Sequence, residues 1–553
     1  MVFEKFLKNN LEIVYLYFKN QSNFVIKIYN FKKMRSFFIS IFVGTLLCLL
    51  SCRSDFSFSP STGNLEFSKD TVYLDTVFSK ISSSTYSLKV YNRSSRDIKI
   101  PVLQLEKGLL SKYRMTVDGD QGENGKIFRN TELLANDSLY IFVENTAKID
   151  DANPTDFLYT DTILFDSGSN LQKVALVTLI QDAFFIYPNR ENGIYDQVAI
   201  GLDDQNVVQT VRGRALIGNH PDNGNEFVFT NQKPYVIYGY ASVPEGKTLT
   251  INAGARIHFH ADSGLIVQQN AILKINGEKS MTKNLEKEVI FEGDRLEPFY
   301  SDVPGQWGFV YLRQGSKNHK IDHLTLKNAI VGLIVENNVG SVMQLDNSQF
   351  YDCSNVGIYG RFAHIEATNV VVNNAGQAAL ACTLGGNYNF RHCTFNNNWP
   401  NSKQLSVLID NFYTDANKQD VAFDLTQATF SNCLIYGNNQ TEMILNKNDS
   451  KLFNYQFNNC LIKFNSDDNL FKNNILYDFT SSNYVNCLVS NNTTTIKPNF
   501  QNANKNKLNI DETSEAVKKG DATFLVPFDI LGNPRNTLFA PDLGAYQNAA
   551  FPK

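Results

Sequence analysis

A short motif that recurs in the C-terminal half of the chain constrains the fold more than any other feature. "NCLIYGNN" from Asn432 returns as "NNCLIKFN" from Asn458 and as "NCLVSNN" from Asn486. Earlier units align with it through one apolar reference residue each, at separations of 24, 21, 24, 40, 27 and 27 residues. The reference residues are Leu326, Phe350, Val371, Phe395, Ile435, Ile462 and Val489. A period in the twenties without helical periodicity predicts a solenoid of stacked strands, with an inserted loop or a further unit in the 40-residue interval.

Amides and imidazoles recur three positions before the reference residues. They are His323, Asn347, Thr368, His392, Asn432, Asn459 and Asn486. Equivalent residues of stacked strands lie about 4.8 Å apart, so an Asn at a turn can bond the Asn above and below it. We therefore expect this position to be a turn, with His323 and His392 serving in turn hydrogen bonds.

Four cysteines share the position two before the reference residue: Cys393, Cys433, Cys460 and Cys487. Other units carry Leu324, Ser348 and Asn369 there, so the position should face the core, where cysteine behaves as a small hydrophobe. An exported protein permits disulfides, but Cβ atoms near 4.8 Å with parallel vectors are poorly placed for a bond that prefers about 3.8 Å. The spacing predicts stacked thiols. Cys353 and Cys382 lie off this column and are not expected to pair, and no cysteine or histidine cluster has zinc-site spacing.

Longer segments resemble the right-handed parallel β-helix proteins of the pectate-lyase-like superfamily. They are "PEGKTLTINAGARIHFHADSGLIVQQNAILKING", "PGQWGFVYL" followed by "IDHLTLKNAIVGLIV", and the closing "DILGNPRNTLFAPDLGAYQ". The resemblance implies a β-helix over residues 235–500, a junction and N-terminal cap over 183–234, and a C-terminal coil and cap over 501–553. A leucine-rich horseshoe or a β-propeller fits less well, because their repeat frames are absent.

The segment before the repeats has the pattern of an antiparallel β-sandwich. Short alternating runs such as "DTVYLDTVF", "SLYIFVEN" and "QKVALVTLIQDA" are separated by turn-rich pieces between residues 56 and 182. "STYSLKVYNRSSRDIKI" followed by "LLANDSLYIFVEN" resembles the Ig-like domains that precede repeats in many bacterial surface proteins. We expect an all-β chain, with an Ig-like sandwich over residues 52–182 acting as a spacer or docking module.

The N-terminus carries an export signal, "MRSFFISIFVGTLLCLLSC" from Met34 to Cys52. Its apolar run, Phe37 to Leu50, is shorter than the roughly 20 residues of a spanning helix. The ending "LLSC" resembles the lipobox of bacterial lipoproteins, which implies that residues 1–51 are a leader and signal peptide and that Cys52 is lipidated. Several acyl chains on one residue give lasting membrane attachment. We expect translation to start at Met34, with a longer leader as the alternative, and an ordinary signal peptide is the alternative to lipidation.

Charge argues against a nucleic-acid partner. Residues 1–51 hold seven of the 51 basic and two of the 55 acidic side chains, which leaves 44 basic and 53 acidic side chains from Cys52 onward. A net charge near −9 without a basic cluster does not suit a phosphate backbone. "RSDFSF", with Asp55 close behind Cys52, resembles the signals that direct some lipoproteins to the outer face of the outer membrane.

Enzymes of the resembled superfamily, such as pectate lyases and polygalacturonases, hold carboxylates with Arg or Lys on successive rungs. The "DD" pairs at Asp150, Asp203 and Asp467 do not repeat at rung spacing with a partner. The first place to look is the irregular coil between Phe395 and Ile435, and scattered surface charge is the alternative. The residues expected to gather there are Arg361, Arg391, Lys403 and Asp410.

Four further side chains are weighed as ligands. His258 and His260 in "RIHFHAD" point the same way from one strand, but a third metal ligand is not evident, and both imidazoles are expected to be solvated. Trp307 and Trp399 could stack on sugars or could plug tight turns. We therefore assign no catalytic, cofactor or metal residue.

These features predict a lipid-anchored protein of the cell outer membrane, exposed at the surface and held by Cys52. Its expected role is noncatalytic contact of the β-helix with glycans or with a surface protein. One alternative is a polysaccharide lyase or glycoside hydrolase acting on acidic polysaccharide. The other is a purely structural envelope component.

Overall fold

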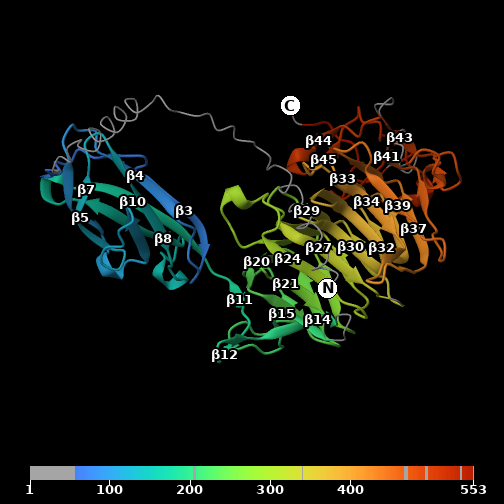
Figure 1. Cartoon of the computed structure of the whole chain (residues 1–553), viewed down its shortest axis with the longest axis horizontal. Helices are drawn as coiled ribbons and strands as arrows, with labels where there is room; N and C mark the ends of the chain where they lie inside the picture. Colours follow the sequence, from blue (N-terminus) through green and yellow to red (C-terminus); the bar gives the residue numbers. More distant parts are fainter. Residues whose placement is uncertain are drawn as a thin grey trace, which may run out of the picture. The chain divides into compact units, whose positions relative to one another are not determined.

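The computed structural model describes residues 57–202, 207–338, 340–465, 471–491, 496–535 and 539–551. Met34, Cys52 and the predicted signal lie outside this range. Within it the chain is all-β: strands and short 3-10 turns occur without an α-helix, and none of these residues forms a helix able to cross a membrane. The chain divides into two compact units (Figure 1). The first comprises the described residues up to Ile180 together with Leu202, Val207 and Val208, and the second comprises Gln181–Gly201 and the described residues from Gln209 onward.

The first unit holds two sheets. The larger has the order β1-β5-β9-β10-β3, with β7 beside β5, and the smaller has the order β2-β4-β8-β6. The strands are β1 (Ser59–Pro60), β2 (Glu66–Phe67), β3 (Thr71–Phe78), β4 (Tyr86–Tyr91), β5 (Ile98–Leu105), β6 (Tyr113–Val117), β7 (Ile127–Leu133), β8 (Ser138–Asn145), β9 (Leu158–Phe165) and β10 (Gln172–Gln181). Alternate side chains of both sheets, including Leu88, Ile141 and Leu176, form one buried cluster. The period-two pattern in the sequence reflects this burial.

The second unit is built, within the described residues, mainly from an 11-stranded and an 18-stranded sheet. The strands of the first are β11 (Phe184–Ile186), β17 (Tyr235–Ile237), β20 (Arg256–Phe259), β23 (Val289–Gly293), β26 (Leu324–Lys327), β29 (Gln349–Cys353), β31 (Val371–Ala375), β33 (Thr394–Asn397), β38 (Leu434–Gly437), β41 (Leu461–Lys463) and β43 (Leu488–Ser490). The strands of the second are β14 (Gln197–Leu202), β15 (Val208–Ala215), β16 (Val228–Phe229), β18 (Tyr240–Val243), β19 (Thr248–Asn252), β21 (Gly264–Val267), β22 (Ile272–Asn276), β24 (Trp307–Leu312), β25 (Lys320–Asp322), β27 (Ala329–Glu336), β28 (Met343–Asp346), β30 (Val356–Thr368), β32 (Ala378–Arg391), β34 (Leu405–Asp410), β37 (Leu425–Ser431), β39 (Met443–Asn446), β40 (Gln456–Asn458) and β42 (Tyr484–Val485).

From β17 onward the chain passes in turn through one strand of the 11-stranded sheet and one or two strands of the 18-stranded sheet, and strands of successive units pair in parallel. The register joins Leu326 to Phe350, and Ile435 to both Phe395 and Ile462, as the repeat alignment predicted. Figure 1 shows β27, β30 and β32 side by side. We call each set of residues paired in this way across successive strands a column.

The alignment was wrong by one residue at a single unit. Phe350 pairs with Val372, and Val372 pairs with Phe395, so Val372 is the core residue. Val371 instead faces outward and is buried by the C-terminal segment. Because residues 370–372 are all valine, apolar character could not distinguish the register.

The recurrent amides occupy a left-handed turn. The position takes φ between 48° and 55° in each unit, and with the register corrected Asn369, not Thr368, belongs to it. Asn and His tolerate this conformation better than most residues. The side chains also bond between units, as predicted: Asn369 Nδ2 donates to Asn347 Oδ1 at 2.8 Å, and Asn432 Nδ2 lies 3.0 Å from His392 Nε2.

The cysteine column is confirmed as stacked thiols. Within the described part of the chain Cys393, Cys433, Cys460 and Cys487 are free, and the backbone N–H of Cys393 donates to Cys433 Sγ at 3.5 Å. The thiols of Cys460 and Cys487 each donate to a backbone carbonyl of the preceding unit at 3.4 Å. In the unit whose core residue is Val372, the cysteine position is held by Val370 and not by Asn369, and Val370 is fully buried. The column therefore serves as core packing.

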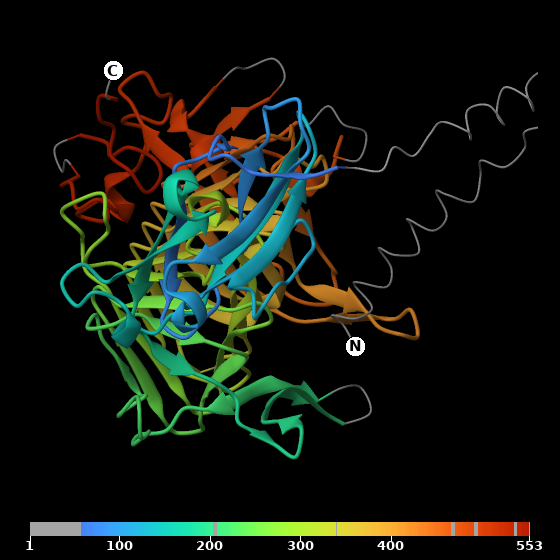
Figure 2. The ribbon, with the colours of Figure 1, turned by 90° about the vertical axis from the view of Figure 1, so that its left-hand side faces the viewer.

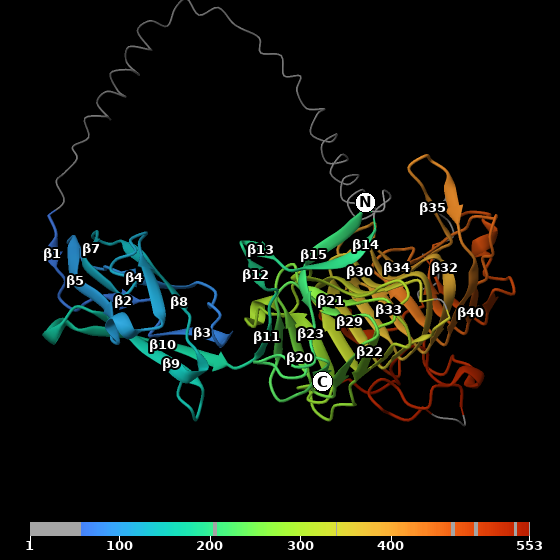
Figure 3. The ribbon, with the colours of Figure 1, turned by 90° about the horizontal axis from the view of Figure 1, so that it is seen from below.

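The 40-residue interval contains an inserted loop and no further unit. The strands β35 (Phe412–Thr414) and β36 (Asp420–Ala422) form an antiparallel hairpin between β34 and β37, and both β34 and β37 pair with β32. Figures 2 and 3 show this hairpin standing away from the stacked strands.

The C-terminal segment lies along a sheet face, which corrects its expected role as an end cap. Apolar residues after β44 (Phe500–Asn502), in and beyond β45 (Lys507–Ile510), pack on outward residues of the 11-stranded sheet. The outward residues they bury are Tyr351, Val371, Leu434 and Leu461. Aromatic residues between positions 471 and 484 pack on the last core residues instead.

Candidate functional site

Four polar residues align on the 18-stranded sheet in what we call the Arg361 column. Glu336 at the end of β27 pairs with Arg361 of β30, and Arg361 pairs with Thr383 of β32. Asp410 ends β34 and follows Ile409, the partner of Cys382, so it stands beside Thr383. Parallel strands place these residues at successive steps of about 4.8 Å.

At the Glu336 end of the column, Glu336 is hydrogen-bonded to both Arg361 and Tyr311. Arg361 Nη1 lies 2.7 Å from Glu336 Oε1, and both side chains are about one quarter exposed. The hydroxyl of Tyr311, from β24, donates to the other Glu336 oxygen. Burial disfavours the charge of Arg361, but Glu336 and the neighbouring tyrosines together outweigh burial and hold the pKa of Arg361 above its ordinary value. Both oxygens of Glu336 are thus occupied by donors.

Asp410 lies in a different environment at the other end of the column. Its Oδ1 accepts the backbone N–H of Leu384 at 2.8 Å, while burial raises the pKa of Asp410 to about 6. Leu384 and Phe362, beside the column on β32 and β30, both have positive φ, at 58° and 47°. Bulky residues adopt this conformation rarely, and such strain concentrates at functional sites.

Aromatic rings of the hairpin flank the column. Tyr413 of β35 is 44% exposed, and its ring stacks on Phe423 at 6.3 Å between centroids. Phe423 in turn contacts Phe362 at 5.5 Å. Tyr413 is close enough to Arg361 to affect its pKa. The site therefore offers a guanidinium, carboxylates and an exposed ring on adjoining elements.

The structure brings together two of the four residues expected here. Arg361 and Asp410 share the column, whereas Arg391 lies at the far end of β32, in register with Thr368 and Ser431. Lys403 is exposed in the loop after Trp399. Sequence reasoning missed Glu336 and Tyr311, although the 25-residue step from Glu336 to Arg361 matches the repeat period.

A second polar column runs through Asp322, Asp346, Thr368 and Arg391. Carboxylates thus do repeat at rung spacing, in contrast to the expectation from the "DD" pairs. Asp322 Oδ1 accepts from His323 at 2.6 Å and from Asn347 at 3.0 Å, and Thr368 donates to Asp346 at 2.5 Å. Burial raises the pKa of Asp346, while hydrogen bonds outweigh burial and lower that of Asp322. Because the polar groups of this column bond to one another and to residues of the left-handed turns, we assign the column a structural role at these turns.

The expectation that both strand histidines are solvated was wrong for His258. Its ring is buried, with Nδ1 3.7 Å from Glu292, which also binds Lys327 at 2.8 Å. His260 is half exposed, and its Nδ1 lies 2.7 Å from Asp294 Oδ2. Neighbouring strands supply these partners, so the imidazoles sit in a charged cluster. Among the residues described, no group of three or more His, Cys, Asp or Glu is arranged to hold a metal ion.

Trp307 belongs to the core. It is fully buried, stacks on Phe259 at 4.2 Å, and donates its Nε1–H to the carbonyl of Lys327 at 2.9 Å. This excludes it from sugar stacking. Trp399 is partly buried in a loop, and its role stays a prediction.

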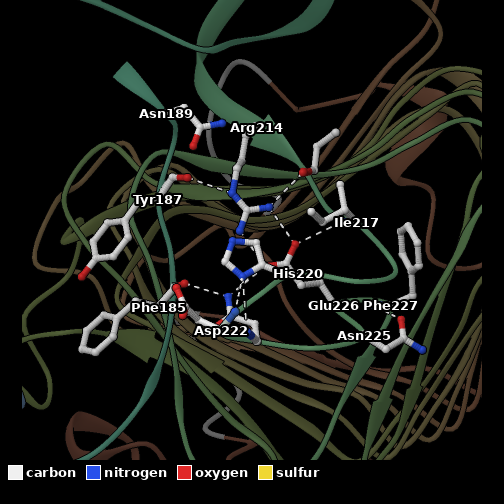
Figure 4. Close-up of polar contacts among 12 residues, drawn as sticks. Phe185, Tyr187, Asn189, Arg214, Ile217, His220, Asp222, Asn225, Glu226 and Phe227 are labelled. Carbon is white, nitrogen blue, oxygen red and sulfur yellow. Dashed lines mark hydrogen bonds and ion pairs between the residues drawn. The ribbon is translucent and has the colours of Figure 1, made fainter. Parts of the chain in front are cut away.

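A buried ion pair near the start of the second unit has a structural role. Arg214 binds Glu226 through two nitrogen–oxygen contacts at 2.6 and 2.7 Å (Figure 4). Glu226 also accepts from Asn223 and from the backbone N–H of Ile217, and Arg214 Nε donates to the carbonyl of Tyr187 at 2.8 Å. These partners come from separate segments, so the pair ties them together and leaves little capacity for a ligand.

Comparisons with known proteins do not identify a family. No family model matches the chain, and no curated protein matches it. Among solved structures, PapD-like domain 7 of human CEP192 has 13% identity over 24% of this chain and 96% of its own, with a TM-score of 0.14. The E. coli chaperone DraB has 11% identity over 26% of this chain and 61% of its own, with a TM-score of 0.15. Scores this low carry no argument, so the chain is described by its own geometry.

Proposed function

We propose that the protein is a lipid-anchored component of the outer membrane, exposed at the cell surface. In this proposal Cys52 carries the lipid, the first unit is an Ig-like sandwich, and the second is a right-handed parallel β-helix. The lipobox-like "LLSC" supports the anchor. The in-register parallel strands of successive units support the β-helix, because a chain that alternates between two parallel sheets at a fixed period forms a coil.

We propose that the β-helix makes noncatalytic contact with glycans through the Arg361 column. The observation that carries this is a planar guanidinium and carboxylates in one column, with the exposed ring of Tyr413 on the adjoining hairpin. Arg361 uses Nη1 for Glu336, and no contact within the described residues occupies its Nε or Nη2. A guanidinium fork that is about one quarter exposed can bind hydroxyl or carboxylate oxygens, and Tyr413 can cover an apolar sugar face.

The spacing of the carboxylates favours binding over hydrolysis. Glu336 and Asp410 are three steps apart, roughly 14 Å at about 4.8 Å per step. Glycosidase carboxylates stand about 5–9.5 Å apart. Both oxygens of Glu336 also accept hydrogen bonds, from Arg361 and from Tyr311, which leaves neither oxygen free to contact a substrate. A lyase or hydrolase remains the second candidate because of the raised pKa of Asp410.

Changes in the Arg361 column should weaken glycan binding. Arg361→Lys keeps the charge but removes the fork, and Tyr413→Ala removes the exposed ring. We expect each to weaken binding of the soluble chain to polygalacturonate about tenfold, as measured by calorimetry. Arg391→Gln, on the same sheet but in the other column, should bind as the wild type does.

If Arg361→Lys binds polygalacturonate as tightly as Arg391→Gln does, the Arg361 column is not the glycan-binding site. Release of unsaturated sugar ends or new reducing ends, tested with and without Ca²⁺, would replace the noncatalytic function by the lyase or hydrolase.

The anchor has its own test in palmitate labelling of cells. Cys52→Ala should abolish incorporation, because the thiol is the proposed attachment point. Cys48→Ala, within the predicted signal four residues earlier, should still be labelled. Label that persists in Cys52→Ala would rule out the anchor.

A further inference from the structure

The first unit carries an aromatic and cationic patch on its smaller sheet, apart from the Arg361 column. Tyr140 and Phe142 are two residues apart on β8, so their side chains share one face. They are 45% and 42% exposed, their centroids are 6.1 Å apart, and their ring planes lie within 11° of parallel. A flat ligand that contacts one ring therefore meets the other in the same orientation.

The neighbouring strands place polar side chains on both sides of these rings. Lys89 of β4 pairs with Tyr140, and Ser87 of β4 pairs with Phe142. On the other side, Thr116 of β6 also pairs with Phe142. Residues directly opposite on adjacent strands share a face. The rings are thus flanked by hydroxyls and an amine, a combination that suits a ligand with apolar faces and polar edges.

The charge of the patch is not balanced within it. Arg93 pairs with Glu66, and Arg114 pairs with Glu144, which also accepts from the hydroxyl of Thr85. Lys89 is in none of the ion pairs found among the described residues; its Nζ lies 5.1 Å from the ring centroid of Tyr140 and 5.3 Å from that of Tyr91. An amine between two aromatic rings that belongs to none of the ion pairs of the described residues leaves one positive charge for an external anion.

We propose that this patch, formed by Ser87, Lys89, Tyr91, Thr116, Tyr140 and Phe142, binds an acidic glycan. The parallel rings take the apolar faces of its sugars, the hydroxyls bond their edges, and Lys89 binds the carboxylate or sulfate. The patch lies in a different unit from the Arg361 column, and binding by either can be lost without the other.

The experiment compares the soluble chain, with both units intact, in its wild-type and variant forms. Calorimetry with polygalacturonate, its methyl-esterified form and dextran sulfate separates uronate, uncharged and sulfate ligands. The double variant Tyr140→Ala/Phe142→Ala should lose about tenfold or more in affinity for the charged polymers. Lys89→Gln should weaken binding of the charged polymers, lower its salt dependence, and leave the methyl ester unaffected. Tyr73→Ala, which removes a 66% exposed ring from the other sheet of the same unit, is the matched control.

The Arg361→Lys background separates the two sites. If the binding that remains in Arg361→Lys falls further when Tyr140 and Phe142 are also replaced, the patch is confirmed. This conclusion holds even if the Arg361 column itself contributes nothing to binding. Wild-type affinity in the double variant overturns the proposal, as does an equal effect of Lys89→Gln on charged and esterified polymers. A concentration-dependent dimer that the double variant abolishes would show that a second copy of the chain covers the patch, and would also overturn it.

Discussion

Replacement of Arg214 by alanine is expected to lower the free energy of unfolding of the second unit by about 3–5 kcal/mol. The Arg214 and Glu226 side chains are only 9% and 1% exposed, so the change leaves a buried carboxylate without its counter-ion. Arg214 also donates to the carbonyls of Tyr187 and Ala215, and these bonds would be lost as well.

The effect can be measured by tryptophan fluorescence during urea denaturation. Both tryptophans of the chain, Trp307 and Trp399, lie in the second unit, so their signal reports its unfolding without that of the first. Lys287→Ala, which breaks the exposed pair with Glu278, is the matched control and should cost far less stability than Arg214→Ala. A loss in Arg214→Ala as small as in the control would show that the pair does not hold these segments together.

The ion pair also predicts how the stability of this unit depends on pH. Burial opposes ionisation of Glu226, but hydrogen bonds from Arg214, Asn223 and Ile217 outweigh it and hold the pKa below 4.5. A depressed folded-state pKa contributes stability that is present above the unfolded value and is lost as pH falls through the folded value. The difference in stability between wild type and Glu226→Gln should therefore shrink below about pH 4.5.

Phe430→Ala is expected to cost about 3–5 kcal/mol of stability in the same unit. Phe430 is fully buried between Phe390 and Phe457, with ring centroids 4.9 Å away on each side, and Tyr484 continues the stack at 5.3 Å. Removing the Phe430 ring opens a cavity inside this stack of aromatic rings. The rings on either side stay in place because their strands are paired in register. Collapse into the cavity is limited because parallel pairing with β32 and β40 fixes the backbone of Phe430 on both sides.

The same fluorescence measurement tests this second prediction. Phe430→Leu, which refills part of the volume, should lose clearly less stability than Phe430→Ala. Phe299→Ala removes a ring that is 80% exposed and should change stability by no more than about 0.5 kcal/mol. If Phe430→Ala resembled Phe299→Ala, the aromatic stack would be incidental to the stability of the unit.

Local patterns made much of the fold predictable. The turn position selects Asn and His through its left-handed backbone, and the core position selects apolar residues, so both recur at the repeat period. The residues 370–372 show the limit, since three valines fit the core position equally well and the register was misassigned by one. Charged residues do not occur in every unit, so their spacing alone does not show which of them share a column. The sequence therefore grouped Arg391 with Arg361, although Arg391 belongs to the second polar column.

By itself the sequence determined the all-β character, the repeat period, the turn column and the thiol column, because each depends on the conformation and burial of one strand or turn. Only the tertiary structure decided which polar side chains meet. Glu336 reaches Arg361 through parallel pairing across 25 residues, and His258 is enclosed by Glu292 and Lys327 from later strands. The C-terminal segment likewise lies on a sheet formed more than 100 residues earlier, because apolar side chains there face outward and need a cover.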